Sequence, residues 1–278
     1  MVALVIILGV AVIAAALCLY LIAAKHDERM KKYENGYYAH RGLHGRVGDY
    51  EDAAPENTLK AFKRAVEMNF GIELDVRLTK DEKMVVFHDD TLKRAAGIDK
   101  KIGELTYAEL SEIPLFGSDE RVPLFTEVLE LVNGSVPLLV EIKDDGFAKT
   151  PEIAMQILKD YKGEFIVESF NPLIMGKVRK FAPEVLRGFL CEHLTNNPEY
   201  KAFKYHIVER NLLNFIAKPH FIAGSFKSFP FFPSKIVKLL FRPAMLAWTV
   251  KSKEDEAEAR SKGFTGMIFE GYIPDRKM

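Results

Sequence analysis

The sequence has no excess of either charge, few cysteines and no low-complexity tract. Lys plus Arg and Asp plus Glu both number 39, so the formal net charge is zero. Proteins that grip the phosphate backbone of nucleic acids need a basic excess, so we expect no nucleic-acid partner. Two cysteines, Cys18 and Cys191, are too few for a disulfide scaffold or a cysteine-based zinc site. An apolar share of 48% excludes a disordered chain and is typical of a globular protein.

One long apolar run stands at the N-terminus, and no second run approaches its length. Residues 2–24 contain no charged side chain. As a helix they would span roughly 34 Å, enough for a hydrocarbon core of about 30 Å. A signal peptide would have a basic start and a shorter apolar core, and a core helix is rarely apolar all round. The sequence therefore predicts a transmembrane anchor over 1–24, a juxtamembrane linker over 25–35 and a globular domain over 36–278.

The charges that flank the apolar run predict its orientation. Basic residues follow the run, whereas none precedes it; they are Lys25, Arg29, Lys31 and Lys32. The positive-inside rule then puts the C-terminal side of the helix in the cytoplasm. We expect a single-pass membrane protein whose globular domain faces the cytoplasm, with an oligomeric state that the sequence does not indicate.

Strand-like and helix-like stretches alternate from Gly36 onward, which favours a parallel sheet covered by helices. A (β/α)8 barrel of about 250 residues fits this length. Nine strands are expected for eight barrel positions, and residues 220–223 fit least well. The long connection over 88–124 predicts a small insertion after strand 3. The expected strands are Gly36–Ala39, Ile72–Leu78, Met84–Phe87, Pro137–Ile142, Phe165–Val167, Val185–Leu190, His220–Ala223, Ala244–Val250 and Gly266–Phe269.

Carboxylates interrupt two of these apolar strands. Glu73 and Asp75 alternate along one strand and so share a face. On the inner face of a barrel they would repel each other unless a cation lay between them; on an edge strand they would be solvated. Glu141 and Lys143 share a face at the end of another strand, where barrel active sites lie. Three carboxylates suit Mg²⁺ or Ca²⁺, and Lys143 could pair with Glu141 or contact a phosphate.

Two histidines lie at strand ends near these carboxylates. His40 and Arg41 end the first strand, and His88 ends the third. An imidazole changes charge near neutral pH, so the two histidines could act as general base and general acid. Trp248 ends a late strand, where it could stack on a ligand or belong to the core, and Glu270 could add a carboxylate at the mouth.

Taken together, these residues resemble the glycerophosphodiester phosphodiesterase family over roughly residues 38–272. The motifs occur in the order of that family and are jointly specific. They are His40-Arg41-Gly42, Pro55-Glu56-Asn57-Thr58, Glu73-x-Asp75, Val86-Phe87-His88-Asp89, Val140-Glu141-Ile142-Lys143, Ser169-Phe170 and Trp248-Thr249-Val250.

The resemblance implies metal-dependent hydrolysis of a phosphodiester in a (β/α)8 barrel with an insertion after the third strand. It assigns Glu73, Asp75 and Glu141 as metal ligands and His40 and His88 as the acid/base pair. It further implies phosphate contacts from Arg41 and Lys143 and a rim that includes Glu56 and Asn57. In that mechanism the metal polarises a phosphoryl oxygen. A substrate hydroxyl attacks phosphorus, and water opens the resulting cyclic phosphate.

Three stretches depart from the family pattern: a long loop between Gly42 and Pro55, a final strand that ends in Phe269-Glu270-Gly271, and a long aromatic stretch over 191–243. Within the last, basic and aromatic residues interleave over 226–242, as in segments that lie on membranes. An ordinary barrel helix with its loop is the alternative.

These observations predict an enzyme that hydrolyses glycerophosphodiesters to an alcohol and glycerol phosphate. One alternative is a lysophospholipase D that acts on membrane lysolipids. Another is an inactive membrane-bound binding barrel, which the full set of histidines and carboxylates disfavours.

Overall fold

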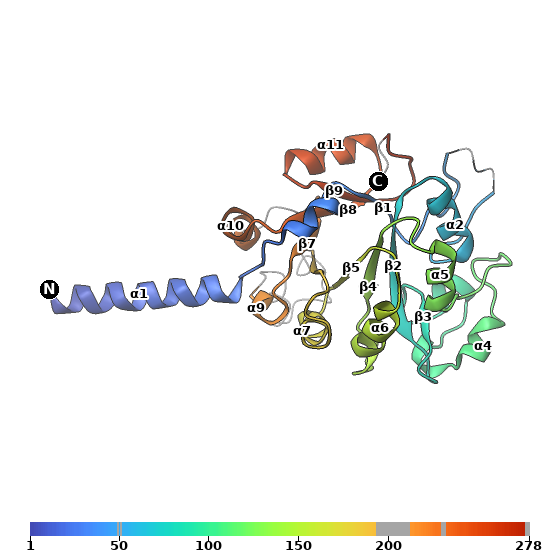
Figure 1. The fold of residues 1–278 in the computed structure, drawn as a ribbon, viewed down its shortest axis with the longest axis horizontal. Helices are drawn as coiled ribbons and strands as arrows, with labels where there is room; N and C mark the ends of the chain where they lie inside the picture. The colour runs from blue at the N-terminus through green and yellow to red at the C-terminus, as the bar shows by residue number, and fades with distance from the viewer. Residues whose placement is uncertain (49, 51, 193–211, 229–231, 276–278) are drawn as a thin grey trace.

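In a computed structural model, the chain forms a closed parallel barrel with one long helix projecting from its side (Figure 1). The structure describes residues 1–278 except 49, 51, 193–211, 229–231 and 276–278. The strands are β1 (Tyr37–Ala39), β2 (Gly71–Leu78), β3 (Met84–Val86), β4 (Leu138–Ile142), β5 (Phe165–Ser169), β6 (Arg187–Cys191), β7 (Phe221–Ser225), β8 (Ala244–Val250) and β9 (Gly266–Phe269).

Most of the helices lie between these strands. They are α1 (Val2–Leu21), η1 (Glu28–Lys32), α2 (Leu59–Glu67), α3 (Lys93–Ala96), η2 (Ile102–Glu104), α4 (Tyr107–Ser111), α5 (Phe125–Val132), α6 (Thr150–Lys159), α7 (Pro172–Phe181), α9 (Asn214–Ala217), α10 (Phe232–Phe241) and α11 (Lys253–Ser261).

Eight parallel strands close the barrel, as the sequence predicts. Their order is β1-β9-β8-β7-β6-β5-β4-β2, and a parallel pairing of β1 with β2 closes the ring. Apolar residues of the strands fill the space between sheet and helices, and a second apolar cluster fills the barrel interior. This is the arrangement in which the carboxyl ends of all eight strands meet at one mouth.

The surplus ninth strand is β3, and the prediction that residues 220–223 fit least well was wrong. β7 pairs in parallel with both β6 and β8 and is a full member of the barrel. β3 instead runs antiparallel to β2. The connection between β2 and β3 is too short to hold a crossover helix, so the chain can only turn back as a hairpin.

The insertion after β3 is confirmed as a small unit with its own apolar cluster. It contains α3, η2 and α4 and buries side chains such as Leu92, Leu110 and Val122, whereas α5, which follows it, belongs to the main core. Leu124 forms an isolated antiparallel bridge with Val85 of β3. The insertion therefore packs on the hairpin that carries His88.

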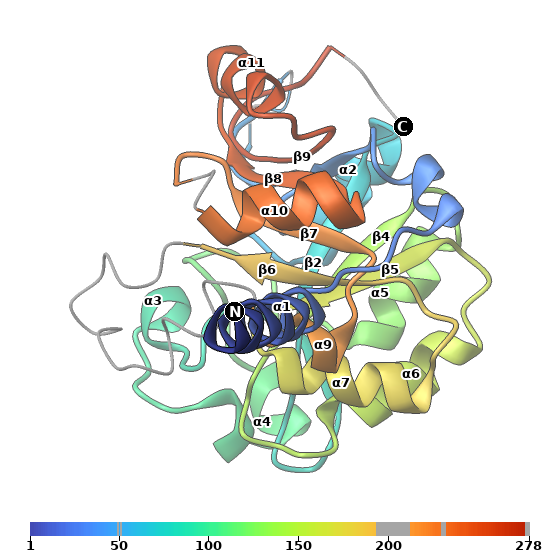
Figure 2. The same ribbon diagram turned by 90° about the vertical axis from the view of Figure 1, so that its left-hand side faces the viewer.

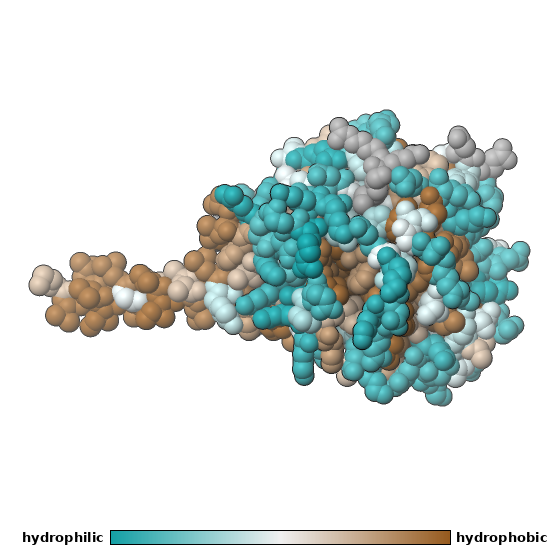
Figure 3. All heavy atoms as spheres, in the orientation of Figure 1, coloured by the Kyte–Doolittle hydropathy of each residue, from teal (hydrophilic) through white to brown (hydrophobic). Residues whose placement is uncertain are grey.

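The helix α1 projects away from the barrel, and the chain after it crosses the same side of the globular part on its way to β1 (Figures 1 and 2). Among the described residues, α1 is the one helix that is long and apolar enough to cross a membrane, a property that a signal sequence shares. None of its residues is buried, and most of its surface is apolar (Figure 3). Met30 and Tyr33, within the predicted linker, are buried among the inner residues of the barrel.

Candidate active site

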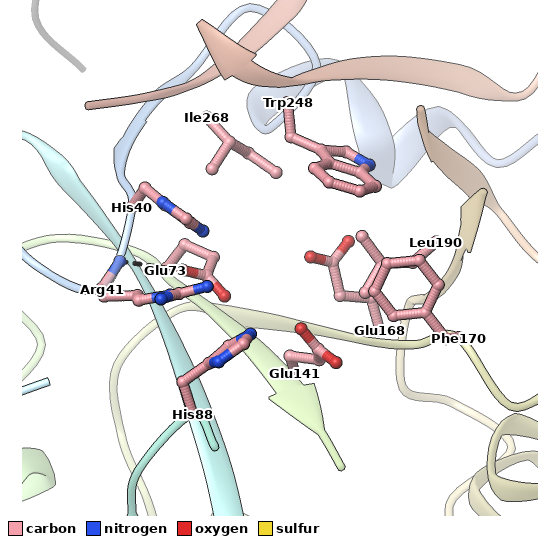
Figure 4. Close-up of a pocket in the computed structure, with 10 residues that line it drawn as sticks. All are labelled: His40, Arg41, Glu73, His88, Glu141, Glu168, Phe170, Leu190, Trp248 and Ile268. Carbon is pink, nitrogen blue, oxygen red and sulfur yellow. Dashed lines mark hydrogen bonds between the residues drawn. The ribbon is translucent and has the colours of Figure 1, made fainter. Parts of the chain in front are cut away.

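The barrel mouth gathers most of the residues that the sequence singles out. A cavity there is lined by His40, Arg41, Glu73, His88, Glu141, Glu168, Phe170, Leu190, Trp248 and Ile268 (Figure 4). Polar residues of β1, β2, β4 and the β3 hairpin form one half of the wall. Phe170, Leu190, Trp248 and Ile268 form an apolar half.

Glu73, Asp75 and Glu141 form a buried cluster of carboxylates. Each offers an oxygen atom within 4.8 Å of the others. The register explains their proximity, because Asp75 of β2 lies directly beside Glu141 of β4. Both strands are buried along their whole length, so the acidic edge-strand alternative is excluded.

Burial and mutual repulsion disfavour the ionised forms of two of these three carboxyl groups. Burial, followed by repulsion from Asp75 and Glu141, raises the pKa of Glu73 well above its ordinary range. Burial also raises the pKa of Glu141 to about 7. Although burial opposes it, Lys143 holds the pKa of Asp75 well below its ordinary value. Closely spaced buried carboxylates of this kind are the oxygen ligands that hard divalent cations prefer.

Lys143 pairs with two of these carboxylates. Its Nζ lies 2.7 Å from Asp75 Oδ1 and 2.7 Å from Glu141 Oε2. This is the pairing that the sequence left as an alternative to a phosphate contact. Lys143 is buried as well, so its positive charge interacts with these carboxylates rather than with solvent.

Arg41 and Asn57 hold the carboxylates from the other side. The Arg41 backbone N–H donates to Glu73 Oε2 at 2.8 Å, and Asn57 Nδ2 donates to Asp75 Oδ2 at 2.8 Å. Arg41 has a φ of 55°, and Gly42 after it has a φ of 79°. A Cβ on Gly42 would meet the Cβ of Ala61 at 2.9 Å, so only glycine fits this turn.

The Arg41 side chain points toward the rim. Its Nη1 donates to Glu56 Oε1 at 2.8 Å, and Arg94 of the insertion also binds Glu56. Glu56 therefore links β1 to the insertion at the edge of the mouth. Neither the sequence motifs nor their spacing pointed to Arg94.

The two histidines sit in matching surroundings. His40 Nδ1 lies 2.8 Å from Glu270 Oε2, and His88 Nδ1 lies 2.7 Å from Asp89 Oδ1. A carboxylate only accepts, so each Nδ1 carries the hydrogen and each Nε2 is the nitrogen left for a ligand. Both rings line the cavity (Figure 4). Burial lowers the pKa of both imidazoles and so favours their neutral forms.

The β2–β3 hairpin explains how His88 reaches the site. β2 continues beyond its pairing with β4, and β3 runs back along it, so that Phe87 N–H donates to Asp75 O. His88 therefore comes level with Asp75 from a strand outside the barrel. The sequence identified the residue but assigned it to a barrel strand.

Glu168 is a fourth buried carboxylate that sequence reasoning missed. It lies on β5 beside Glu141 and lines the cavity (Figure 4). Its Oε2 has no hydrogen-bond partner among the described residues. Burial, with repulsion from Glu73 and Glu141, raises its pKa well above the ordinary value. The signal was present in the sequence, since Glu168 interrupts an apolar strand as Glu141 does.

Trp248, Ser169 and His44 have different surroundings. Trp248 lines the cavity and also packs on the inner core, with its ring 5.6 Å from Phe170 in an edge-to-face contact. Ser169 instead turns its hydroxyl to Ile142 O. His44 forms a second possible metal group with His40 and Glu270, although it does not line the cavity.

Comparison with known proteins identifies the family. The model of the glycerophosphoryl diester phosphodiesterase family matches residues 40–271. The chain belongs to this family. It is 32% identical to a glycerophosphodiester phosphodiesterase of Caldanaerobacter subterraneus subsp. tengcongensis, over 83% of this chain and 91% of that one. The sequence-based resemblance and the prediction of a phosphodiester hydrolase are thus confirmed.

Two further relatives place the chain within the family. A Rattus norvegicus lysophospholipase D is 31% identical over 57% of this chain and 52% of its own length. The solved glycerophosphodiester phosphodiesterase of Thermotoga maritima superposes with a TM-score of 0.63, at 28% identity, over 84% of this chain and 93% of that one. Proteins named for glycerophosphodiester hydrolysis and for lysophospholipase D activity are therefore both similar to this chain.

Proposed function

We propose that the chain hydrolyses glycerophosphodiesters at the barrel mouth, with Mg²⁺ or Ca²⁺ held by Glu73, Asp75 and Glu141. The convergence of three buried carboxylates with two carboxylate-held imidazoles in one cavity is the observation that carries this proposal. When bound, the cation supplies charge stabilisation at the phosphoryl group. Without it the carboxylates repel one another in a buried site.

The chain's own residues supply binding and proton transfer. Arg41 has a guanidinium on the rim side of the cluster, where it can bind a phosphoryl oxygen, while Lys143 sets the charge of Asp75 and Glu141. One neutral imidazole takes the proton of the attacking hydroxyl at Nε2. The other gives a proton from Nε2 to the leaving oxygen, and for this it must be in the doubly protonated form, with its Nδ1 hydrogen still held by the carboxylate. Glu270 and Asp89 hold the two rings for these transfers.

The apolar half of the cavity suits the carbon backbone of a substrate. Phe170, Leu190 and Trp248 can pack on a glycerol or alcohol group, and Glu168 can hydrogen-bond a hydroxyl there. A lysophospholipase D activity is a second candidate. It is supported by the similarity to the rat enzyme and by the apolar helix α1, which we propose anchors the chain with its barrel on the cytoplasmic side.

A substrate panel tests the proposal and separates the two activities. The full chain in detergent is supplied with glycerophosphocholine, glycerophosphoethanolamine and lysophosphatidylcholine, with Mg²⁺ or Ca²⁺, and the products are resolved by ³¹P NMR. We expect glycerol phosphate from the first two. Release of choline from the lysolipid at a higher kcat/KM would favour the second candidate, and no hydrolysis of any of the three would contradict both.

A further inference from the structure

The helices around the exit of α1 differ in composition from the rest of the barrel surface. Beyond Met1 and α1, five large apolar side chains are exposed among the described residues, and four of them lie on α7 and α10. Leu239 and Leu240 on α10 are 73% and 55% exposed. Leu173 and Phe181 stand at the two ends of α7, and the fifth, Phe116, lies in the insertion.

The charge of these helices is one-sided. α7, α9 and α10 contain no acidic residue, although they carry Lys177, Arg179, Lys180, Lys235 and Lys238. Each of the longer helices elsewhere on the barrel, α2, α5, α6 and α11, carries at least one carboxylate. A chain with no net charge therefore has one side that is basic and apolar. Such a combination is typical of surfaces that lie on anionic lipid.

α1 is fixed to this same side. Asn214 Nδ2 at the start of α9 donates to Ile22 O at 3.0 Å, and the Lys25 N–H donates to Pro219 O at 2.7 Å. The Tyr20 ring lies 5.5 Å from that of Phe215 on α9. Figures 1 and 2 show α9 and α10 on the side from which α1 projects, with α7 next to α9. In Figure 3 the apolar surface of α1 continues onto the adjoining edge of the globular part.

A shallow groove on this side adds a place for a headgroup. It is lined by residues of α7 and by Ile216 of α9, with Lys177, Arg179 and Lys180 among them. Arg179 is occupied by backbone carbonyls of α9. No described carboxylate pairs with Lys177 or Lys180. Lys177 Nζ donates to Ala148 O at 2.9 Å and Lys180 Nζ lies over the Phe181 ring, but each ammonium group has further N–H donors that can contact a phosphate of a lipid.

We propose that the exposed face of α7, α9 and α10, here called the basic apolar face, lies on the surface of the bilayer that α1 crosses. Its occupant is a membrane that contains anionic lipid. The barrel then rests on its side, because α7 and α10 flank the barrel wall rather than its ends. Phe170 lines the catalytic cavity, and Leu173, three residues later, is on the basic apolar face. The rim of the mouth thus meets the lipid surface, where lipid-derived diesters are released.

Site-specific fluorescence in the full chain tests this surface. In a Cys18→Ser background, where Cys191 is buried, single cysteines at Leu239, Leu173, Phe116 and Val12 are labelled with an environment-sensitive dye. The labelled chain is reconstituted into vesicles of phosphatidylcholine with or without phosphatidylglycerol. Phe116 is the matched control, an exposed apolar residue away from the face, and Val12 reports insertion of α1.

We expect lipid-borne nitroxide to quench the dye at positions 239, 173 and 12, and iodide in water to quench it at 116. Quenching at 239 should be stronger with phosphatidylglycerol and at least halve in the triple variant Lys177→Glu, Lys180→Glu, Lys235→Glu. If iodide fails to quench the dye at position 12 but quenches the dyes at 239 and 173, the lipid contact of the basic apolar face is overturned and the anchoring by α1 stands. An accessible dye at 12 would overturn the anchor as well. If the dye at position 239 becomes less accessible to iodide as the protein concentration in detergent rises, the face is a contact between copies of the chain and the lipid proposal is overturned.

The proposal goes beyond catalysis and rests only on the anchoring role of α1. Hydrolysis of glycerophosphocholine is measured on each labelled variant, so loss of activity and loss of lipid contact are scored separately.

Discussion

Glu270 holds His40 across the closure of the barrel. The two residues are 230 positions apart and meet because β9 pairs with β1. The hydrogen bond from His40 lowers the pKa of Glu270 to about 2, and only a quarter of the Glu270 side chain is exposed. The ionised carboxylate therefore keeps the His40 hydrogen on Nδ1 and stabilises any positive charge that the ring gains during turnover.

The first prediction concerns Glu270→Gln. A carboxyl group whose pKa is lower in the folded state contributes stability above its unfolded pKa of 4.5 and loses it as pH falls toward 2. After allowance for solvent, we expect the variant to be less stable by about 1–2 kcal/mol at pH 6. The difference should shrink below pH 4.5. Denaturant unfolding of the full chain, followed by the fluorescence of its single tryptophan, measures it.

Activity provides the second readout of the same variant. The amide oxygen of Gln can still accept from Nδ1 but carries no charge. We expect a fall in kcat smaller than the about 10²–10⁴-fold loss expected when general acid–base catalysis is removed. A kcat equal to that of wild type would refute the role of Glu270 in positioning His40.

At the scale of elements, the sequence predicts the barrel and most strand-end residues but not every partner of those residues. The alternation of apolar strands and the carboxylates within them can be recognised in the sequence, so Glu73, Asp75 and Glu141 could be predicted to form one site. The pairing of Glu270 with His40 could not, because it depends on how the barrel closes. The roles of β3 and β7 were predicted wrongly, because a short apolar run does not indicate whether the strand runs parallel or antiparallel to its neighbour. The length of the connection that precedes the strand decides this.

The 3₁₀ helix η1 is another element whose packing the sequence did not reveal. Charged residues dominate it, yet Met30 is only 2% exposed and lies against the inner core of the barrel. One buried side chain among charged neighbours gives no periodic pattern. This short helix therefore stabilises the barrel in addition to joining it to α1.

Met30→Ala tests the contribution of η1. Loss of a buried methionine typically costs about 2–5 kcal/mol, because the transfer energy is lost and a cavity remains. Lys31→Ala on the same helix is the matched control, since the Lys31 side chain is 69% exposed and pairs with the exposed Glu28. We expect its effect to stay within about 0.5 kcal/mol. Equal destabilisation by the two variants, in denaturant unfolding, would show that Met30 does not support the barrel.

At the scale of the whole molecule, α1 and the basic apolar face carry the proposed attachment of the barrel to a membrane. α1 is exposed along its length and is joined to the barrel through α9 and the residues after Ile22. With α1 crossing a membrane, as we propose, the basic residues that follow it predict a cytoplasmic barrel under the positive-inside rule. The site would then meet diesters produced inside the cell.

The topology has a direct check in intact cells. In the Cys18→Ser background, a cysteine at Lys93 on the exposed surface of the insertion should react with a membrane-impermeant maleimide only after the cells are permeabilised. Reaction in intact cells would place the barrel outside and contradict the flanking-charge argument.

The central claim is that the buried carboxylates and the two imidazoles act together on a phosphodiester. Its most direct test is the rate of glycerophosphodiester hydrolysis by the chelator-stripped full chain as Mg²⁺ or Ca²⁺ is added back. Wild type and His26→Ala, which alters an exposed histidine far from the mouth, should regain activity with the cation. His88→Ala should stay about 10²-fold or more below them at saturating cation. Hydrolysis that needs no cation, or that survives in His88→Ala, would contradict the account.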